Sequence, residues 1–424
     1  MAERLQEIWR NTWREINFAL KIKSVRWVLL AASMISLVGT LCGLIEVNQQ
    51  RTQLADLKAS ISEEQAHVLP AQTSAGGAAY YLFHLTYDPP SELAFSALGV
   101  RGEYSWKHRL RMLALEGQIY ESDPGNPEMS SLGKLDFAYV VSILLPLFII
   151  GLLFDLNASE RRDARYELLC ATSTQGPRII SYRAFARLLL LIGAIVSPFL
   201  LIALSIGASI ASLAAIILVV VLHALFWLVV CRWITEKLLD GTTVVVSLFG
   251  IWLVLTVLVP VSGKAIVEQQ ISVPSGGEIL LAQREKVNGA WDLPKSVTMN
   301  AFFETHPQWS DTAAVKKPFE WKWYYAFQQV GDQHVGPLSV ALQQGIKARH
   351  MRMGWVAWLS PSFAVERWMT RIAATDVQQH QNYVSCVRDF HKALRDFHYP
   401  MLFGNKEFNA ESVTDIPRYL PCGL

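Results

Sequence analysis

Five long apolar segments, each nearly free of charged residues, constrain the fold of this chain more than any other feature. A helix needs roughly 20 apolar residues to cross a hydrocarbon core of about 30 Å. The sequence therefore predicts a mainly α fold, a polytopic membrane helical bundle with about five spans. The predicted spans are residues 27–47, 135–156, 188–206, 208–230 and 242–261.

Composition agrees with insertion in a lipid bilayer. Hydrophobic residues make up 52% of the chain and charged residues 17%, whereas soluble domains average roughly 25% charged residues. The net charge of +2 gives no argument for a nucleic-acid partner, and none is expected. The first 26 residues are polar, and no small-residue cleavage site follows the first apolar run, so we expect that run to remain as a span.

Lysine and arginine in the short loops predict the orientation, because basic residues are enriched on the cytoplasmic side. They cluster before the first span, after the second and after the fourth, which places the N-terminus in the cytoplasm of a bacterial cell with the spans in its inner membrane. The cytoplasmic loops are then 157–187 and 231–241, and the large extracytoplasmic regions are 48–134 and 263–424. We expect those two regions to be mixed α/β. The basic residues are Arg4, Arg10, Arg14, Lys21, Lys23 and Arg26, then Arg161, Arg162, Arg165, Arg178, Arg183 and Arg187, then Arg232 and Lys237.

Three segments next to the spans have helical patterns. Residues 1–26 predict a cytoplasmic amphipathic helix, either in the membrane interface or packed on protein. Residues 48–69 carry a thin apolar stripe, so the first span can continue outward as one long helix that breaks at Ser74–Gly77. Met353–Phe363 is too short to cross and predicts an interfacial or buried segment. In the second extracytoplasmic region, strand-like and turn-rich parts are expected first and helices from about residue 338.

No motif for catalysis is present. The sequence lacks the phosphate-binding loop of ATPases, the zinc-protease motif and the serine-hydrolase elbow, so we expect no catalytic residues, no metal and no cofactor in this chain. His380, His391 and His398 are separated by 11 and 7 residues, which is not close metal-ligand spacing, and they are expected on a solvated helix face.

A few other polar residues invite a functional interpretation. Glu116, Asp123 and Glu128 lie in one region, where solvated charges are expected. His223 is the polar exception in the fourth span, either a hydrogen-bonded core histidine or a functional one.

The cysteines divide between the two sides of the predicted membrane. Cys386 and Cys422 both fall outside, where they form either a disulfide or two free thiols. Cys42, Cys170 and Cys231 fall in spans or inside and are expected to be reduced.

The loop 157–187 predicts contact with another protein. Its sequence "NASERRDARYELLCATSTQGPRIISYRAFARL" indicates a short charged helix, a break at Gly176–Pro177 and a basic helix that leads into the third span. A compact helical loop of this kind can dock into a cleft on a partner ATPase, whose movement would tilt the spans on either side. The alternative is a plain basic loop that only sets the orientation.

Several stretches resemble one known family. These are "YYLFHLTYDPPSELAFSALG", "LALEGQIYESDPGNPE", "LDFAYVVSILLPLFIIGLLFDLNASERRDARYELL", "FFETHPQW" and "WLSPSFAVERW", from about residue 78 to 420. They are similar to ABC type 2 exporter permeases, in the subgroup with a large extracytoplasmic domain of unknown function. The resemblance implies two permeases, either identical or related, and two cytoplasmic ATP-binding subunits that hold ATP and Mg²⁺.

The resemblance also implies a coupling helix after the second span, which here would contain Glu160, Arg161, Arg162, Arg165 and Glu167. The segment "ERRDARYE" lacks the acidic-then-glycine pattern usual in the family. Family members normally have a sixth span after a stretch like "DIPRYLP", which here lies close to Leu424. Two interpretations follow, a five-span protein with its C-terminus outside or a sequence truncated before its sixth span.

Three functions are consistent with these observations. The first is the permease subunit of an ABC exporter. The second is a mechanotransmission subunit, which moves its periplasmic regions to act on a periplasmic partner without transporting a substrate. The third is a membrane-anchored enzyme or sensor, for which the sequence offers no catalytic constellation.

Overall fold

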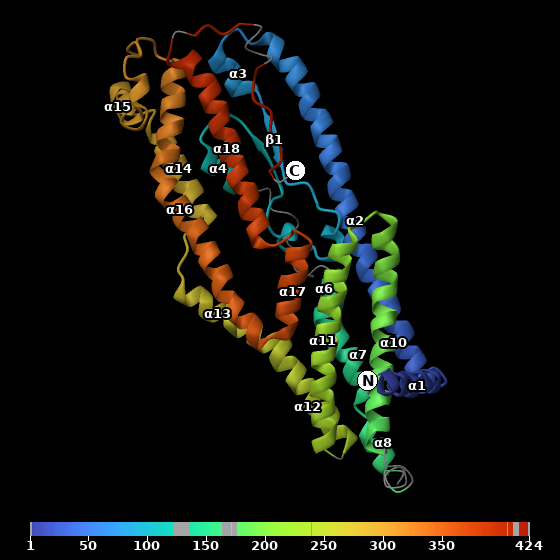
Figure 1. Ribbon diagram of the computed structural model, residues 1–424. Helices are drawn as coiled ribbons and strands as arrows, with labels where there is room; N and C mark the ends of the chain where they lie inside the picture. Colours follow the sequence, from blue (N-terminus) through green and yellow to red (C-terminus); the bar gives the residue numbers. More distant parts are fainter. Residues whose placement is uncertain are drawn as a thin grey trace.

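The protein is largely helical and consists of a bundle of long helices and a second part, here called the head (Figure 1). The head comprises the described residues of 69–121 and 271–422, together with the second half of the first long helix. We call the opposite end of the bundle, with α1, α8 and the α11–α12 turn, the base. The computed structural model describes residues 2–121, 135–162, 171, 176–238, 240–404, 406–409 and 415–422.

Five helices in this part of the chain are long and apolar enough to cross a membrane, as the sequence predicts. Each overlaps one of the predicted segments, and we call them spans 1 to 5. Span 1 is α2 (Lys23–Val68), span 3 is α10 (Gly176–Ser205) and span 4 is α11 (Ile210–Lys237). Span 2 consists of α6 (Phe137–Tyr139), the π-turn η4 (Val140–Leu144), α7 (Leu145–Leu153) and α8 (Leu156–Arg162). Span 5 consists of α12 (Gly241–Leu253), the π-turn η5 (Val254–Leu258) and α13 (Val259–Gln270).

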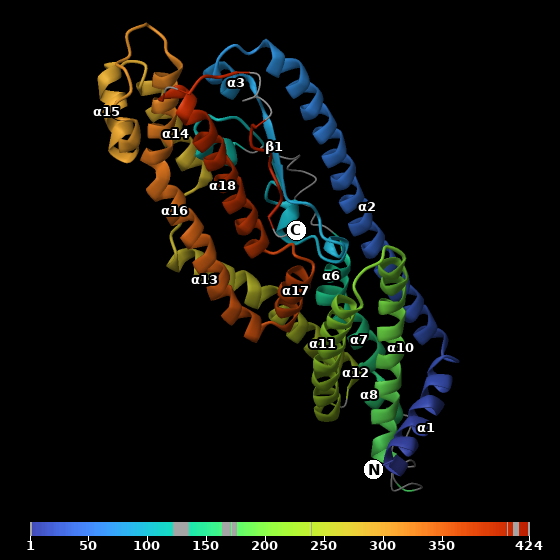
Figure 2. The same ribbon diagram turned by 45° about the horizontal axis from the view of Figure 1, so that its top comes forward.

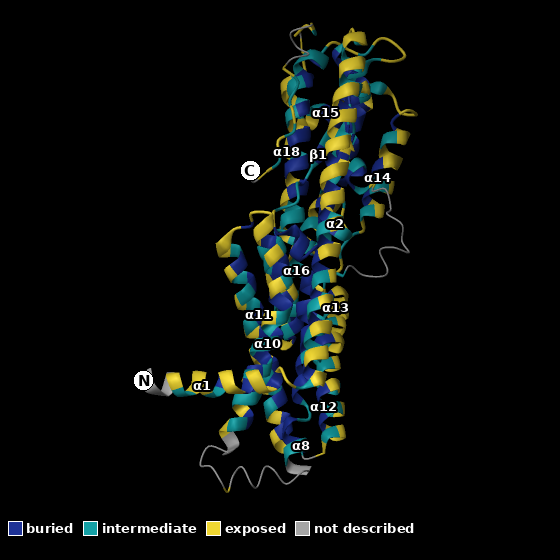
Figure 3. Cartoon of the chain, turned by 90° about the vertical axis from the view of Figure 1, so that its right-hand side faces the viewer, coloured by how far each residue is buried: buried dark blue, intermediate teal, exposed yellow. Residues whose placement is uncertain are grey.

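The first helix, α1 (Ala2–Ala19), lies across the base instead of continuing the line of α2 (Figure 3). Its buried residues Thr12, Glu15 and Ala19 form one face, and α1 packs against α10. Trp9 and Trp13 on the other face are 62% and 55% exposed. An amphipathic helix with exposed tryptophans suits the interface of a membrane.

Helix α2 runs without a break from the base to the far end of the head (Figures 1 and 2). Its 46 residues correspond to about 69 Å at 1.5 Å per residue. The predicted continuation of the first span as one long helix is therefore confirmed. The helix ends at Val68, before the predicted break, and the turn η1 (Leu69–Ala71) follows; Ser74 then caps α3 (Ala75–Tyr81) by accepting the N–H of Gly77 at 3.2 Å.

Two other boundaries depend on local backbone chemistry. Gly207, between α10 and α11, has φ +80°, which a residue with a side chain rarely adopts. The predicted break between the third and fourth spans is thus correct. Span 5 continues past Pro260 to Gln270, and the π-turn η5 interrupts the regular helical hydrogen bonding just before this proline, which has no N–H to donate.

Close contact between α2 and the start of the head depends on two glycines. A Cβ atom at Gly43 would overlap the backbone carbonyl of Phe95 in η2 (Ala94–Ser96), and one at Gly39 would lie 3.0 Å from the carbonyl oxygen of Asp136. Phe95, Phe137 and Phe199 are fully buried beside them; the rings of Phe137 and Phe199 stack with centroids 4.2 Å apart. The three rings join the head to spans 2 and 3.

The head is more helical than the expected mixed α/β fold. Its described residues contain one two-stranded antiparallel sheet, in which His84 lies opposite Leu110. The two strands are β1 (His84–Tyr87) and β2 (Lys107–Leu110). The remaining elements are helices or short helical turns, namely η3 (Gly99–Gly102), α4 (Leu115–Tyr120), α14 (Gly276–Gly289), α15 (Lys295–Thr305), η6 (Pro307–Trp309), α16 (Trp321–Leu359), α17 (Pro361–Ile372) and α18 (Val377–Leu402).

The expectation of strand-like structure after residue 263 is wrong, because the sequence Ser275–Gly276–Gly277, which suggests a turn, begins a helix. Ser275 Oγ accepts the N–H of Glu278 at 3.1 Å, and Glu278 Oε2 accepts the N–H of Ser275 at 2.8 Å. This reciprocal pair is a capping box, which begins α14.

Buried polar residues fill the head's interior, contrary to the expected solvated face. His391 and His398 in α18 are 1% and 0% exposed, because α18 packs against α16, α3 and α4. His380 is half-buried and stacks on Tyr104. Glu116 is buried and forms two hydrogen bonds of 2.8 Å with Arg388. No cluster of His, Cys, Asp and Glu among the described residues could hold a metal ion.

Cys386 in α18 and Cys422 form a disulfide, with their Cα atoms 6.2 Å apart. This bond ties the segment 415–422 to α18. Cys42 and Cys231 are free, and Cys170 lies outside the described residues. Of the three acidic residues expected to be solvated, Asp123 and Glu128 also lie outside them.

We predict that Gly43→Ala destabilises the protein by about 1–3 kcal/mol or more, because the added methyl group meets backbone that cannot move aside. Gly193→Ala in α10 is the matched control, since a Cβ atom there meets nothing within 4 Å. Thermal unfolding in detergent measures both. Equal midpoints for the two variants would contradict the close approach.

We also predict that acidification from pH 7.5 to pH 5 destabilises the head. Burial lowers the pKa of four head histidines below 6.5, so the unfolded chain binds more protons and stability falls as the pH drops below about 6.5. Burial also raises the pKa of Asp332, to about 6, and the pKa values of Asp88 and Glu366, which oppose this trend, while it lowers the pKa of the half-buried His380 to about 4, which adds to it. The four fully buried histidines are His84 and His108, with a pKa of about 4, and His391 and His398, with a pKa of about 3.

The variant His391→Leu tests the origin of this pH dependence. At pH 5 the acid-induced loss of stability should be smaller than in the wild type by about 2 kcal/mol. His334→Leu, which changes an exposed histidine, should leave the pH profile unchanged. Parallel profiles for all three proteins would show that the buried histidines are not responsible.

Candidate functional site

Span 2 connects the predicted coupling loop at the base with the head. It extends from Phe137 to Glu160, 24 residues or about 36 Å. Its α7 packs against spans 1, 3, 4 and 5, so span 2 is central in the bundle. Ionised side chains hold each of its two ends, and these two ends together form the candidate functional site.

At the base, three elements meet at one arginine. Arg183 in α10 donates from Nε to Glu15 Oε2 at 3.0 Å and from Nη1 to Glu160 Oε1 at 2.5 Å. All three side chains are largely buried, with 15%, 7% and 12% exposure for Arg183, Glu15 and Glu160. We call this group the base triad. Breaking a buried ion pair on one side leaves an uncompensated charge, so the triad holds α1, α8 and α10 firmly together.

The structure places only part of the predicted coupling helix. Glu160 is part of the base triad, and Arg161 and Arg162 are the last two residues of α8. Arg165 and Glu167 lie outside the described residues. Arg187, one turn after Arg183, donates from Nη1 to the carbonyl of Leu152 at 2.6 Å and so adds a second link between spans 2 and 3.

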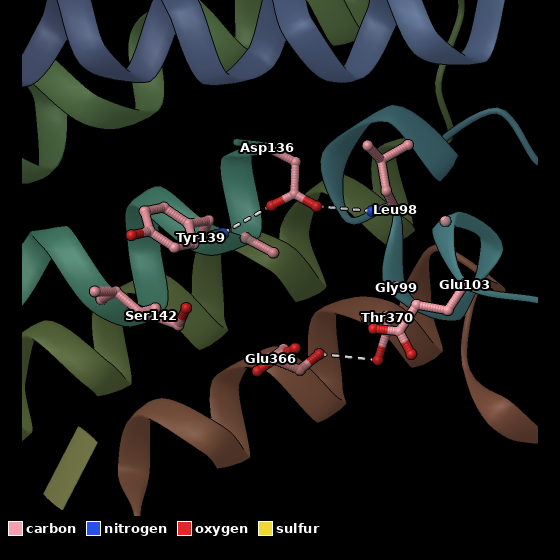
Figure 4. Close-up of a pocket in the computed structure, with 11 residues that line it drawn as sticks. Leu98, Gly99, Glu103, Asp136, Tyr139, Ser142, Glu366 and Thr370 are labelled. Atoms are coloured by element: carbon pink, nitrogen blue, oxygen red, sulfur yellow. Dashed lines mark hydrogen bonds between the residues drawn. The ribbon is translucent and has the colours of Figure 1, made fainter. Parts of the chain in front are cut away.

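At the head end, Asp136 joins span 2 to the head. Its Oδ1 accepts the N–H of Tyr139 at 2.8 Å, which caps α6, and its Oδ2 accepts the N–H of Leu98 at 2.8 Å (Figure 4). The carboxylate is 7% exposed. One buried side chain thus fixes both the start of span 2 and the segment before η3.

The turn between α17 and α18 binds the same segment from the other side. Thr375 donates from Oγ1 to the carbonyl of Ala97 at 2.7 Å and accepts the N–H of Val100 on its own carbonyl at 3.0 Å. Gly99 has φ +49°, and a Cβ atom there would overlap the carbonyl of Thr375. We call the contacts of Asp136 and Thr375 with residues 97–100 the junction.

A cavity of about 240 Å³ lies at the junction, between η3, the start of span 2 and α17 (Figure 4). Asp136, Glu103 and Glu366 line it, and no basic side chain does. The pKa of Glu366 is raised, first because neighbouring atoms desolvate the carboxylate and then because Asp136 and Glu103 are negative. The cavity is suited to a positively charged group.

His223 lies buried in span 4, at 3% exposure. Among the described residues, neither ring nitrogen has a hydrogen bond of acceptable distance and angle, although the ring is close enough to the Ser142 backbone to interact with it. His223 is therefore a core histidine, as one of the two expectations has it, but the hydrogen bond of that expectation is not formed among the described residues. Ser142 belongs to the π-turn η4, where the regular bonding of the helix is interrupted.

Sequence reasoning missed the residues that make the junction. Asp136 is noticeable only as a charge near a span end, and an aspartate directly before an apolar run is a common helix cap. Gly39 and Gly43 form a G-x-x-x-G pattern, which indicates close helix packing in membranes. That pattern could have revealed the packed face of α2.

We predict that Asp136→Asn destabilises the protein by about 1.5–3 kcal/mol, because an amide retains one acceptor for two buried N–H groups. Proteolysis between residues 97 and 104 should become faster, since Leu98 loses its bond to span 2. Asp56→Asn, on an exposed face of α2, controls for the loss of charge. Unchanged proteolysis would refute the role of Asp136 at the junction.

Comparison with known proteins gives one match. The family model described as "Domain of unknown function (DUF3526)" matches residues 277–421, about a third of the chain. The matched part contains α15 to α18 and nearly all of α14. No curated protein and no solved structure matches.

Proposed function

We propose that this protein is the permease subunit of an ABC exporter, driven by a separate cytoplasmic ATPase that binds ATP and Mg²⁺. The base triad is the observation that carries the proposal. Because Glu15, Arg183 and Glu160 join α1, α8 and α10, a partner that pushes on the loop 157–187 moves spans 2 and 3 together with the interfacial helix.

Charge and cysteine chemistry support the orientation that this function needs. The basic residues Arg183, Arg187, Arg232 and Lys237 lie on the base half of the bundle, the side expected to face the cytoplasm. The head contains the disulfide, which suits an oxidising compartment such as the periplasm. The bacterial inner membrane is therefore the proposed location, with a second copy or a related permease as the other half of the transporter.

Mechanotransmission is the second candidate, and α2 favours it. A single helix passes from the base to the end of the head, and the junction connects span 2 to the same head. Movement at the base can therefore reach a periplasmic partner without a substrate passing through the bundle. In both candidates the ATPase acts on the same loop.

Co-purification tests the ATPase partner directly. The tagged protein, expressed with its native neighbours, is purified in mild detergent and the eluate is assayed for ATP hydrolysis. An ATP-binding chain with vanadate-sensitive activity is the expected result. A protein that elutes folded but alone and inactive would remove the main support for both candidates.

We predict that replacing Glu160 and Arg161 by alanine lowers the ATPase activity of the co-purified complex several-fold, because the base triad loses its link to α8. Glu236→Ala, which removes an exposed partner of Arg232 on the other base loop, should retain activity. The variants must keep the wild-type elution volume. Equal ATPase activity in all proteins would contradict the assignment of this loop to coupling.

A further inference from the structure

The tip of the α16–α17 hairpin reaches into the depth of the bundle. Helix α16 descends from the head, the chain turns at Ser360, and α17 returns toward the head (Figure 1). Ser362 Oγ lies 2.9 Å from Thr256 Oγ1, near the middle of span 5. Val365 and Met369 belong to the same apolar core as the spans. The tip therefore lies beside the membrane-spanning helices, not above them.

Large apolar side chains at this tip point away from the protein. Trp355, Trp358 and Leu359 are 72%, 85% and 66% exposed. Exposing such a cluster to water is unfavourable, at about 25 cal/mol per Å² of apolar surface. At this depth the same side chains face lipid, and tryptophans are enriched at the border between hydrocarbon and headgroups.

A cavity of about 550 Å³ opens between the two arms of the hairpin. Its wall includes Trp358 and Trp368, together with the small residues Gly354, Ala357 and Ala364. This lining is mostly apolar, and its size is in the range of sites for small organic ligands.

Two arginines one turn apart add positive charge to this wall. Arg371 is exposed, and its guanidinium has no hydrogen bond or ion pair among the described residues. The guanidinium of Arg367 lies 3.2 Å from both the His350 carbonyl and its Nε2. Asp376 is the one carboxylate of the lining, and its Oδ1 already accepts the N–H of Gln379 at the start of α18. Positive charge is therefore in excess.

We propose that this cavity binds an anionic phospholipid from the leaflet on the head side of the bundle. The lipid phosphate pairs with Arg367 and Arg371, since guanidinium groups form strong, charge-assisted hydrogen bonds to phosphate. The first part of an acyl chain lies along Trp358 and Trp368. The depth of the cavity, its apolar wall and its two arginines together favour a lipid. A soluble anion would leave the space beside the two tryptophans unfilled. This site is independent of the ATPase partner.

Titration with phosphatidylglycerol tests the site. The 424-residue protein, stripped of lipid in detergent, is titrated while native mass spectrometry counts bound lipid and thermal unfolding is followed. The variants are Arg371→Gln and Arg367→Gln/Arg371→Gln. Arg352→Gln removes an equal charge from an exposed position on α16 that does not line the cavity.

The double variant should bind phosphatidylglycerol about tenfold or more weakly than wild type, whereas Arg352→Gln should bind as wild type does. If the double variant does not unfold cooperatively without lipid, Arg371→Gln carries the test and Arg371→Lys should restore binding. Equal binding by all variants overturns the proposal. Stabilisation by inorganic phosphate equal to that by phosphatidylglycerol would also overturn it and indicate a soluble anion. Loss of a dimer by the double variant in light scattering would overturn it as well and assign this face to contact with a second copy.

Discussion

Direct backbone contact between α2 and η2 is the constraint on which the rest of the structure depends. Only glycine fits at position 43, because Phe95 places its carbonyl group against the helix there. This contact brings Phe95 to the ring of Phe199, which stacks on Phe137. The head is then near enough for Asp136 to bond the N–H of Leu98, and for Thr375 to bind the same segment. A larger residue at position 43 would separate all of these groups.

At both ends of span 2, buried carboxylates are held by directed hydrogen bonds. In the base triad, two carboxylates share one guanidinium; at the junction, one carboxylate accepts two backbone N–H groups. Each charge is compensated by directed bonds, as burial requires. Between these ends α7 is apolar and packs closely against the other spans.

The length and hydropathy of uninterrupted apolar runs were sufficient to locate the helices that could cross a membrane, because both are properties of a single segment. The break at Gly207 and the continuation of α2 were likewise readable from local chemistry. The junction was not, because the meaning of Asp136 and Gly43 depends on residues far away in the chain. Ser275 misled for a related reason: a serine followed by glycines resembles a turn unless the reciprocal Glu278 is noticed.

The buried histidines of α18 show a further limit of the sequence pattern. His391 and His398 each follow an apolar residue, Val387 and Leu394, by four positions, so both lie on the apolar stripe of α18, and only their polarity suggested exposure. Other helices and the sheet contact this face of α18, so neutral imidazoles are enclosed where solvent was expected. The same enclosure gives the head its predicted sensitivity to acid.

The unbroken length of α2 gives it the property of a lever. For a rigid rod of about 69 Å pivoting at its base end, each degree of tilt displaces the far end by about 1.2 Å. A tilt of a few degrees at the base end would thus displace the far end of α2 by several ångströms where it meets η1. The far end of the head would amplify motions that are small inside the bundle, and a partner bound there would experience the largest excursion in the molecule.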